Sequence, residues 1–309
     1  MSGSSKKVIF AALAGNALIS ITKFVAAGIT GSSAMFSEGI HSLVDTGNQV
    51  LLLYGLKQAK KPADKSFPFG HGKEIYFWSF IVAILIFAVG AGVSIYEGIL
   101  HIRHPEPIEN PLINYIVLGL ALVFEGAAWF LAFKEFGKVK GKKGYVKAVQ
   151  EGKDPTLFVI LFEDSAAMLG LVVAFVGILL SQYTGIHEFD GLASVIIGII
   201  LAGTAIWLAV ETKSLLIGES AEDAIVEGIR NIVAGCDEAE HVNEVLTMHM
   251  GPDFILATVS IDFRDDVPAG QLEQTIARLD RLIKKTYPLV KRVFVEAESR
   301  RSEVEGEAN

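Results

Sequence analysis

Two side chains, at positions 41 and 45, have the types and the spacing that binding of a divalent metal requires. His41 and Asp45 lie four residues apart, and residues four apart share one face of a helix. An imidazole and a carboxylate on one face suit a divalent metal such as zinc. They equally suit a hydrogen bond that joins two helices. Asn48 and Gln49 continue the polar stripe, which indicates that it lines a cavity.

A second acidic pair, Glu163 and Asp164, lies in another apolar stretch. Neighbouring residues on a helix point about 100° apart, so we expect only one of them to face the first pair. At 1.5 Å per residue, Asp164 lies roughly 12 Å from the end of its helix and Asp45 roughly 16 Å from the same side. The alternative is that these acids pair with lysines or serve as polar caps. We favour a bound cation as the counter-charge, because we expect no Lys or Arg in the middle of any apolar run. Asn16 is a further candidate lining residue, and a role in helix packing is an equally favoured interpretation.

A third, weaker candidate is the pair Asp64 and His71, in the segment between the second and third apolar stretches. Two ligands are too few for a closed zinc site. An ordinary charged turn is therefore the favoured interpretation of the spacing.

These residues lie in or between apolar runs that are long enough to cross a bilayer as helices, which takes about 20 residues. An ionisable side chain inside a bilayer costs roughly 2.5–3.5 kcal/mol at the helix centre, so the acids there are informative. The sequence predicts six such runs: Val8–Ile29, Ser33–Leu56, Ile75–His101, Leu112–Phe133, Thr156–Gln182 and Phe189–Val210.

The short connections predict the orientation, because cytoplasmic loops carry an excess of Lys and Arg. The N-terminus and the even-numbered connections are rich in lysine, whereas the odd-numbered connections are poor in Lys and Arg. We therefore expect both termini to be cytoplasmic. The short loops, together with the absence of a presequence, favour a bacterial cytoplasmic (inner) membrane.

After about Glu211 the pattern changes to short alternating segments and two helix-like stretches. The order predicts a small cytoplasmic α+β domain of the αββαβ type. We expect a six-helix transmembrane domain over 1–211, the α+β domain over 212–299 and a disordered acidic tail over 300–309. The expected helices and strands are Ala221–Ala234, Val242–Met250, Ile255–Phe263, Ala269–Tyr287 and Phe294–Glu298.

Composition agrees with an α-helical membrane protein and excludes several other classes. The 309 residues are 51% hydrophobic, and the mean hydropathy is +0.45, which argues against an ordinary soluble globule and against disorder. Cys236 is the only cysteine, so a disulfide scaffold and a Cys-rich zinc site are excluded. With 27 Lys and Arg against 35 Asp and Glu, we expect no nucleic-acid partner.

The motifs together resemble the cation diffusion facilitator family of divalent-metal transporters. The resemblance covers nearly the whole chain and rests on Ser33–Glu38 leading into His41 and Asp45, on Phe69–Glu74, and on the acidic fifth run. The pattern is similar to that of the branch that contains the mitochondrial zinc transporters. The family's transport site takes two ligands each from the second and fifth helices.

Carried over by position, the resemblance implies His41, Asp45 and Asp164 as the main site. The remaining family position is Ile160 here, a departure that leaves Glu163, Asn16 or water as the fourth ligand. The family's loop site would use Asp64 and His71, but its middle ligand falls at Phe67, which implies a weak or absent site. The zinc pair of the cytoplasmic domain is expected to be missing, because its positions correspond to Asn243, Thr258, Gln274 and Glu296, with Glu298 at the acidic position.

These expectations add up to a transporter, not an enzyme. We expect a homodimeric antiporter in membrane lipid that exchanges protons for exported divalent metal, with zinc before iron, cobalt, nickel and manganese. Metal needs deprotonated ligands, so protonation weakens binding, and His41 is the side chain whose ordinary pKa lies nearest neutrality. A non-transporting metal sensor or scaffold is the alternative. A membrane metalloprotease is disfavoured, because no His-Glu-x-x-His motif occurs.

Overall fold

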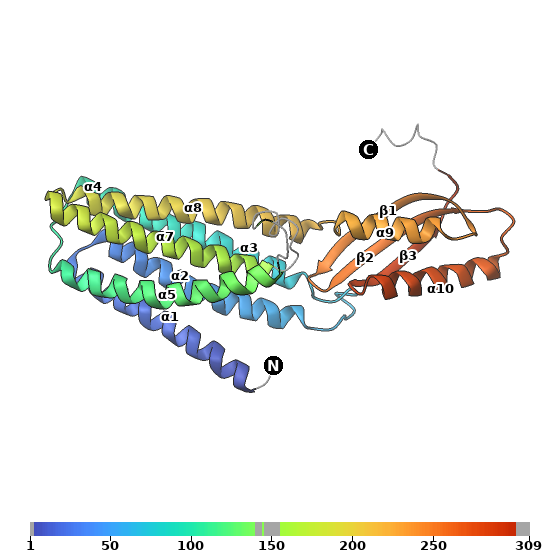
Figure 1. Cartoon of the computed structure of the whole chain (residues 1–309), viewed down its shortest axis with the longest axis horizontal. Coiled ribbons are helices and arrows are strands. Elements are labelled where there is room, and N and C mark those ends of the chain that lie inside the picture. Colours follow the sequence, from blue (N-terminus) through green and yellow to red (C-terminus); the bar gives the residue numbers. More distant parts are fainter. Residues whose placement is uncertain (1–2, 140–143, 145–154, 301–309) are drawn as a thin grey trace. The chain divides into compact units, whose positions relative to one another are not determined.

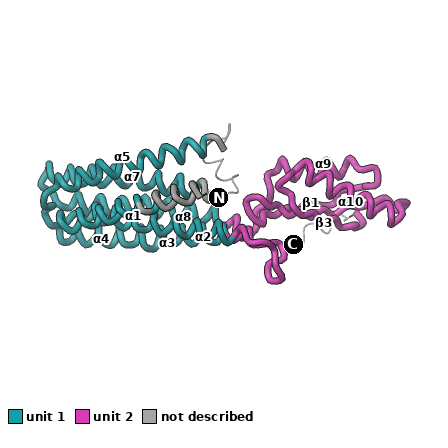
Figure 2. The backbone as a smooth tube through the Cα atoms, turned by 90° about the horizontal axis from the view of Figure 1, so that it is seen from below, with its two compact units in different colours: residues 1–58, 75–213 teal, residues 59–74, 214–309 magenta. Residues whose placement is uncertain are grey.

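The protein, seen here as a computed structural model, divides into two compact units (Figure 2). The structure describes residues 3–139, 144 and 155–300. The first unit comprises Met1–Gln58 and Ile75–Lys213, and the second comprises Ala59–Glu74 and Ser214–Asn309. The predicted tail over 300–309 lies, apart from its first residue, outside the described residues, as do most lysines of the fourth connection.

The first unit is built from long helices that run side by side (Figure 1). Its third segment is continuous but contains a π-helical stretch, η1. Two of its helices are followed directly by a glycine with positive φ, Gly31 at 70° and Gly185 at 72°. Glycine adopts this left-handed conformation most easily, and helices commonly end at such a residue. The bounds are α1 Gly3–Thr30, α2 Ser33–Ala59, α3 Glu74–Leu85, η1 Ile86–Ala91, α4 Gly92–Arg103, α5 Pro111–Val139, α7 Pro155–Thr184 and α8 Glu188–Ile217.

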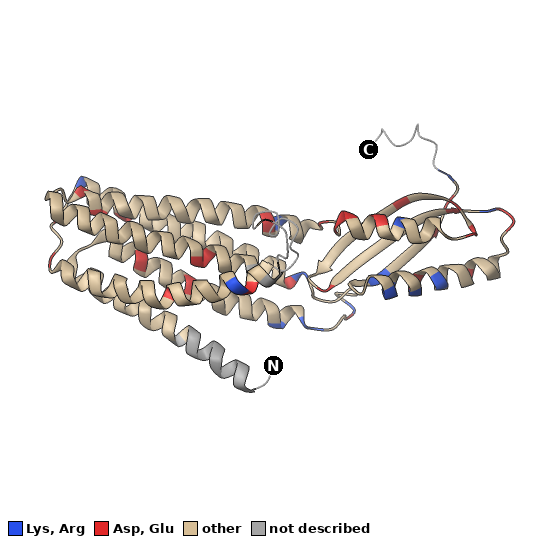
Figure 3. Ribbon diagram, viewed as in Figure 1, with Lys and Arg blue, Asp and Glu red and all other residues tan. Residues whose placement is uncertain are grey.

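Four helical segments in the described part of the chain are long and apolar enough to span a membrane. They are Glu74–Arg103, Pro111–Gly137, Phe158–Thr184 and Glu188–Ile217. The described apolar part of α1, Gly15–Thr30, is shorter, and α2 carries several polar and charged side chains along its 27 residues. In Figure 3 charged residues are sparse along these helices. The chain is therefore a multi-pass membrane protein, and six crossings stay a prediction.

Glycines bring α4 and α8 into backbone contact. A Cβ added at Gly98 would lie 2.7 Å from the carbonyl oxygen of Gly191, and one added at Gly198 would lie 3.0 Å from the backbone nitrogen of Ile95. Small residues allow such close approach between membrane helices. The helices α4 and α8 therefore pack closely against each other.

The second unit contains a three-stranded sheet and two helices. Its elements are α9 Asp223–Ala234, β1 Ala239–Gly251, β2 Phe254–Phe263, α10 Ala269–Thr286 and β3 Val290–Ala297. The sheet order is β1-β2-β3; β1 and β2 are antiparallel, and β2 and β3 are parallel. A parallel pair needs a long crossover, which α10 provides. The core is made by Ile229, Val233, Ile255, Val259, Leu279 and Ile283, among others.

The strands are longer than the sequence patterns predicted. β1 begins three residues before the predicted Val242, and β3 begins at Val290, four residues before the predicted Phe294. Pairing with β2 extends both strands beyond their regular apolar alternation: Ala239 pairs with Phe263, and Val290 pairs with Ile255. Neighbouring-strand pairing of this kind leaves no trace in a single segment's periodicity.

Candidate metal site

His41 and Asp45 meet on one face of α2. Nδ1 of His41 lies 3.3 Å from Oδ1 of Asp45, and the His41 side chain is 1% exposed. The predicted spacing of four residues thus gives contact between an imidazole and a carboxylate inside the helical unit. Neither ring nitrogen of His41 satisfies the geometry of a hydrogen bond with a described residue.

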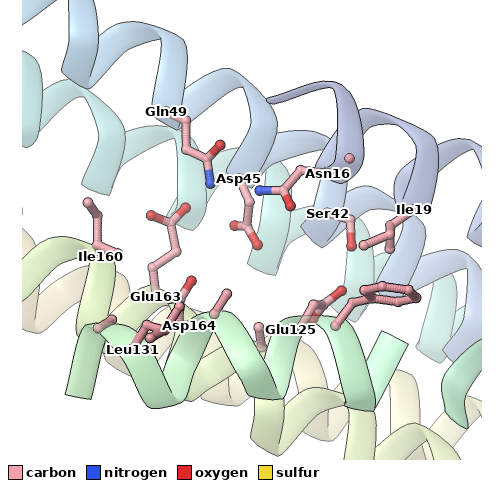
Figure 4. A pocket seen from close by; sticks show the side chains of 15 residues that line it. Asn16, Ile19, Ser42, Asp45, Gln49, Glu125, Leu131, Ile160, Glu163 and Asp164 are labelled. Carbon is pink, nitrogen blue, oxygen red and sulfur yellow. The ribbon is translucent and has the colours of Figure 1, made fainter. Parts of the chain in front are cut away.

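A cavity of about 430 Å³ lies beside this pair, between α1, α2, α5 and α7 (Figure 4). Its walls carry amide, hydroxyl and carboxylate groups that could surround a cation. His41 is not among the lining residues, although Asp45 and the adjacent Ser42 are. The polar lining residues are Asn16, Ser42, Asp45, Gln49, Glu125, Glu163 and Asp164.

Glu163 and Asp164 both line the cavity, whereas the sequence predicted that only one would face α2. The cavity is wide enough for two carboxylates that point in different directions to reach it (Figure 4). Glu163 is held against α2, because Nδ2 of Asn48 donates a hydrogen bond to its Oε1 at 2.6 Å. The carboxyl groups of Asp45 and Glu163 are also in hydrogen-bonding contact. Two carboxyl groups in contact need a shared proton or a cation between them.

Ile160 lines the same cavity (Figure 4). The residue that departs from the family pattern therefore gives an apolar patch to the wall, one turn before Asp164. Asn16 of α1, the other suggested source of a fourth ligand, also lines the cavity.

The structure does not bring a complete set of metal ligands together. Within the described residues, no three His, Cys, Asp or Glu side chains lie close enough to hold a metal ion. Binding of one metal by three of the predicted ligands therefore requires these side chains to draw closer to one another.

A buried lysine next to the cavity shows that the prediction of no Lys or Arg in the middle of any apolar run was wrong. Lys23 lies inside α1 and is fully buried. Its Nζ lies 3.0 Å from Oε2 of Glu38, 2.9 Å from Oε1 of Glu125 and 2.8 Å from Oγ of Ser42. The signal that could have found it is the ionisable residue itself, since a lysine inside an apolar run needs a partner.

A second polar cluster lies at the start of α2, away from the cavity. Asp190 of α8 is buried and accepts hydrogen bonds from Oγ of Ser32 at 2.7 Å and from the backbone N–H of Ser33 at 2.5 Å. Nε2 of His101 lies 3.6 Å from the same carboxylate. Sequence patterns did not single out this cluster, because Asp190 lies at the edge of its apolar run.

The loop pair Asp64 and His71 is close together, with Nε2 of His71 3.5 Å from Oδ2 of Asp64. Oδ1 of Asp64 accepts hydrogen bonds from the backbone N–H groups of Ser66 and Phe67, each at 2.8 Å. The bond from Phe67 is the main cause that lowers the pKa of Asp64. This is the geometry of an Asx turn, so local turn structure accounts for Asp64 without a metal.

In the second unit, two of the positions named for the family's zinc pair, Asn243 and the acidic position Glu298, are joined by hydrogen bonds, both directly and through Ser260. Nδ2 of Asn243 donates to Oγ of Ser260 at 3.1 Å and to the backbone oxygen of Glu298 at 3.0 Å. The Ser260 hydroxyl in turn donates to Oε2 of Glu298 at 2.7 Å. These side chains therefore connect β1, β2 and the end of β3 through hydrogen bonds.

Comparisons with known proteins agree with a membrane transport site. The family described as the cation efflux transmembrane domain matches residues 9–217. The human mitochondrial proton-coupled zinc antiporter SLC30A9 is 35% identical over 259 residues, 83% of this chain and 46% of that protein. Metal tolerance protein C4 of Arabidopsis thaliana is 28% identical over 84% of this chain and 57% of that protein.

A bacterial relative is matched over almost its whole length. The manganese efflux system protein MneP of Bacillus subtilis is 24% identical over 298 residues, 94% of this chain and 95% of that protein. In contrast, the chain spans about half the length of the antiporter and of the metal tolerance protein.

Proposed function

Because the chain belongs to the cation efflux family, also called the cation diffusion facilitators, we propose that it exports divalent metal cations in exchange for protons, with zinc as the first candidate. Membership confirms the predicted resemblance, and it places the chain among transporters rather than enzymes. The observation that carries the proposal is the cavity that Asp45, Glu163 and Asp164 share inside the helical unit.

His41, Asp45 and Asp164 are the main ligands that we propose. Glu163 is the nearest further carboxylate, since it contacts Asp45 directly. Nitrogen and carboxylate oxygen together favour zinc over manganese, for which carboxylates would be expected to dominate. The named activity of the zinc antiporter supports the same metal, whereas that of MneP makes manganese the runner-up.

Proton exchange follows from the chemistry of these ligands. A carboxylate or an imidazole binds metal only after it has lost its proton. Protons entering from one side of the membrane therefore release metal there, and metal bound from the other side releases protons. Alternating exposure of one central site to the two sides converts this competition into exchange.

The membrane orientation that we propose has both termini in the cytoplasm of a bacterial cell, on the basis of the lysine-rich connections. The zinc antiporter that the chain resembles is mitochondrial by name, which makes a mitochondrial membrane the alternative location. Reporter fusions at the N-terminus and after residue 299 measure the orientation; a reporter active outside the cytoplasm would contradict it.

We propose that two copies associate through the open face of the sheet. The strand register places Leu246, Thr258 and Phe294 in one row across the three strands. Leu246 is 55% exposed and Phe294 is 48% exposed, so this row presents apolar surface that a second copy would cover. Light scattering of the purified chain should give twice the mass of one chain, and Leu246→Glu should halve it.

Transport is tested with the full chain in liposomes under an imposed pH gradient. Zinc uptake should depend on the gradient, and Asp45→Asn or Asp164→Asn should abolish uptake while the protein stays monodisperse. Glu135→Gln, an exposed acid on α5 that does not line the cavity, is the matched control and should transport normally. Undiminished uptake by both cavity variants would contradict the site. Zinc binding without flux in the unmodified protein would instead favour the sensor or scaffold.

A further inference from the structure

The cavity carries more negative charge than its surroundings balance. Four carboxylates line it, and no Lys or Arg is among its described lining residues. A charged group that is removed from water needs a partner of opposite charge. The four are Asp45, Glu125, Glu163 and Asp164.

Glu125 differs from the other three acids because it comes from α5, whereas the proposed ligands come from α2 and α7. One of its oxygens, Oε1, is 2.9 Å from Nζ of Lys23. The other, Oε2, is buried without a hydrogen-bond partner among the described residues. The Glu125 side chain is 18% exposed, and Figure 4 shows it at the same cavity as Asp45 and Asp164. An oxygen of this kind is available to a cation.

Lys23 cannot neutralise both of its acidic partners. Its single positive charge is shared between Glu38, at 3.0 Å, and Glu125, at 2.9 Å. Glu38 is fully buried, whereas Glu125 reaches the cavity. The excess negative charge of the trio is therefore presented to the cavity by Glu125.

Unpartnered polar atoms lie on His41 and Asn48, which do not line the cavity themselves but contact its acids Asp45 and Glu163. His41 is 1% exposed, and neither of its ring nitrogens makes a hydrogen bond within the described part of the chain, although Nδ1 faces Asp45. Asn48 is 0% exposed, and its carbonyl oxygen Oδ1 has no partner among the described residues. Buried polar groups normally find partners, and nitrogen and oxygen atoms of these types are metal ligands.

We propose that Glu125 is a further metal ligand, and that Lys23 is a tethered cation that holds Glu125 until a divalent metal displaces it. The inference rests on the proposed function and adds a third helix to the site. When metal arrives, the Lys23 ammonium keeps Glu38 and Ser42, which already lie at 3.0 and 2.8 Å. Glu125 exchanges a monovalent partner for a divalent one, and the Lys23 ammonium keeps a carboxylate partner in Glu38. The additional carboxylate offsets the ligand missing at Ile160.

The test is zinc binding by the purified full chain, with zinc ion alone as the probe and at one fixed pH. Glu125→Gln should weaken binding by about tenfold, at the lower end of the effect of removing a supporting group at a metal site. The paired variant Lys23→Met with Glu38→Gln removes one charge of each sign, so that the cluster keeps its net charge. It should tighten zinc binding by about tenfold, because Glu125 then has no competing partner.

The combination of the variants decides whether Lys23 acts through Glu125. In the Glu125→Gln background, the paired change should alter the affinity by less than about twofold, which is the usual error of additivity. An equal effect of the paired change with and without Glu125 would overturn the inference, as would unaltered zinc binding by Glu125→Gln. Glu135→Gln on the same helix is the control for loss of an acid outside the cavity.

A different pattern of zinc binding is expected if the proposed main site, rather than the role of Glu125, is wrong. Asp45→Asn should remove most zinc binding if the proposed main site is correct. Normal binding by Asp45→Asn would overturn the main site itself. Loss of binding in Asp45→Asn together with normal binding in Glu125→Gln would overturn only the role of Glu125.

Discussion

The backbone N–H of Ser33 donates a hydrogen bond to Oδ2 of Asp190 at 2.5 Å, although the two residues lie 157 positions apart. The carboxylate of α8 thereby caps the start of α2 together with the Ser32 hydroxyl, which accepts a hydrogen bond from the N–H of Met35 at 3.1 Å. An acid at this position satisfies free N–H groups and matches the positive end of the helix dipole. The contact fixes the end of the helix that carries His41 and Asp45.

Asp190→Ala should therefore destabilise the helical unit by about 2 kcal/mol, the typical size of hydrogen bonds to a charged group. The thermal midpoint in detergent measures the loss. Glu188→Gln, an exposed acid two residues earlier in α8, should leave the midpoint unchanged. Equal midpoints for Asp190→Ala and the unmodified protein would refute the capping role.

Lys23→Met alone should be more harmful to stability than the paired change with Glu38→Gln. The single change leaves the fully buried Glu38 without its cation, and breaking a buried ion pair in this way costs about 3–5 kcal/mol. The paired change removes both charges of that pair and should restore most of the loss. Thermal unfolding of both variants in the same detergent makes the comparison, and a paired variant no more stable than the single one argues against the ion pair.

Ile160→Asp should strengthen zinc binding, because Ile160 already lines the cavity near Asp164. The new carboxylate occupies the ligand position that the family pattern expects. We expect an increase in affinity on the order of tenfold, comparable to the effect of a supporting group at a metal site. Ile160→Leu controls for the change of shape. A zinc affinity equal in the two variants would show that this wall of the cavity does not reach the metal.

In the second unit, Glu238 should contribute to stability in a way that depends on pH. Hydrogen bonds, foremost from the thiol of Cys236, lower the pKa of Glu238 from 4.5 to about 2. A group whose pKa falls on folding stabilises the protein above its unfolded pKa, and this contribution disappears as the pH falls through the folded pKa. The window here runs from about pH 4.5 down to about pH 2.

Calorimetric unfolding of the full chain measures this effect as a difference. The gap in thermal midpoint between the unmodified protein and Glu238→Gln should be full at pH 5 and should shrink steadily towards pH 2. Asp237→Asn, at the exposed neighbouring residue, serves as the background variant. A gap that stays constant over the whole window contradicts the lowered pKa.

Two relationships between candidate site residues could be predicted from local geometry. His41 and Asp45 meet because four residues complete about one helical turn. The sequence predicted similar depths for Asp45 and Asp164 in their helices, and both residues line the same cavity. Both arguments need only the rise per residue and the length of the apolar runs.

The parts that the sequence did not reveal depend on which helices are neighbours. Lys23 finds its partners 15 and 102 residues away, and a single lysine barely changes the mean hydropathy of a long run. Glu125 lay unnoticed in its apolar run for the same reason. Asp190 meets Ser33 only because α8 packs beside the start of α2. The hydrophobic periodicity of a single helix does not show which other helix packs against it.

The positions of the Lys23 partners also impose an order on assembly. Glu38 is made 15 residues after Lys23, whereas Glu125 is made 102 residues after it. At about 5–20 residues per second, the second interval lasts about 5–20 s. We expect α1 and α2 to enter the membrane as a helical hairpin during that time, with the Lys23 ammonium already paired with Glu38 and Ser42. When α5 packs against α1 and α2, Lys23 and Glu38 already balance each other's charge. Glu125 of α5 then adds a negative charge that Lys23 alone does not neutralise.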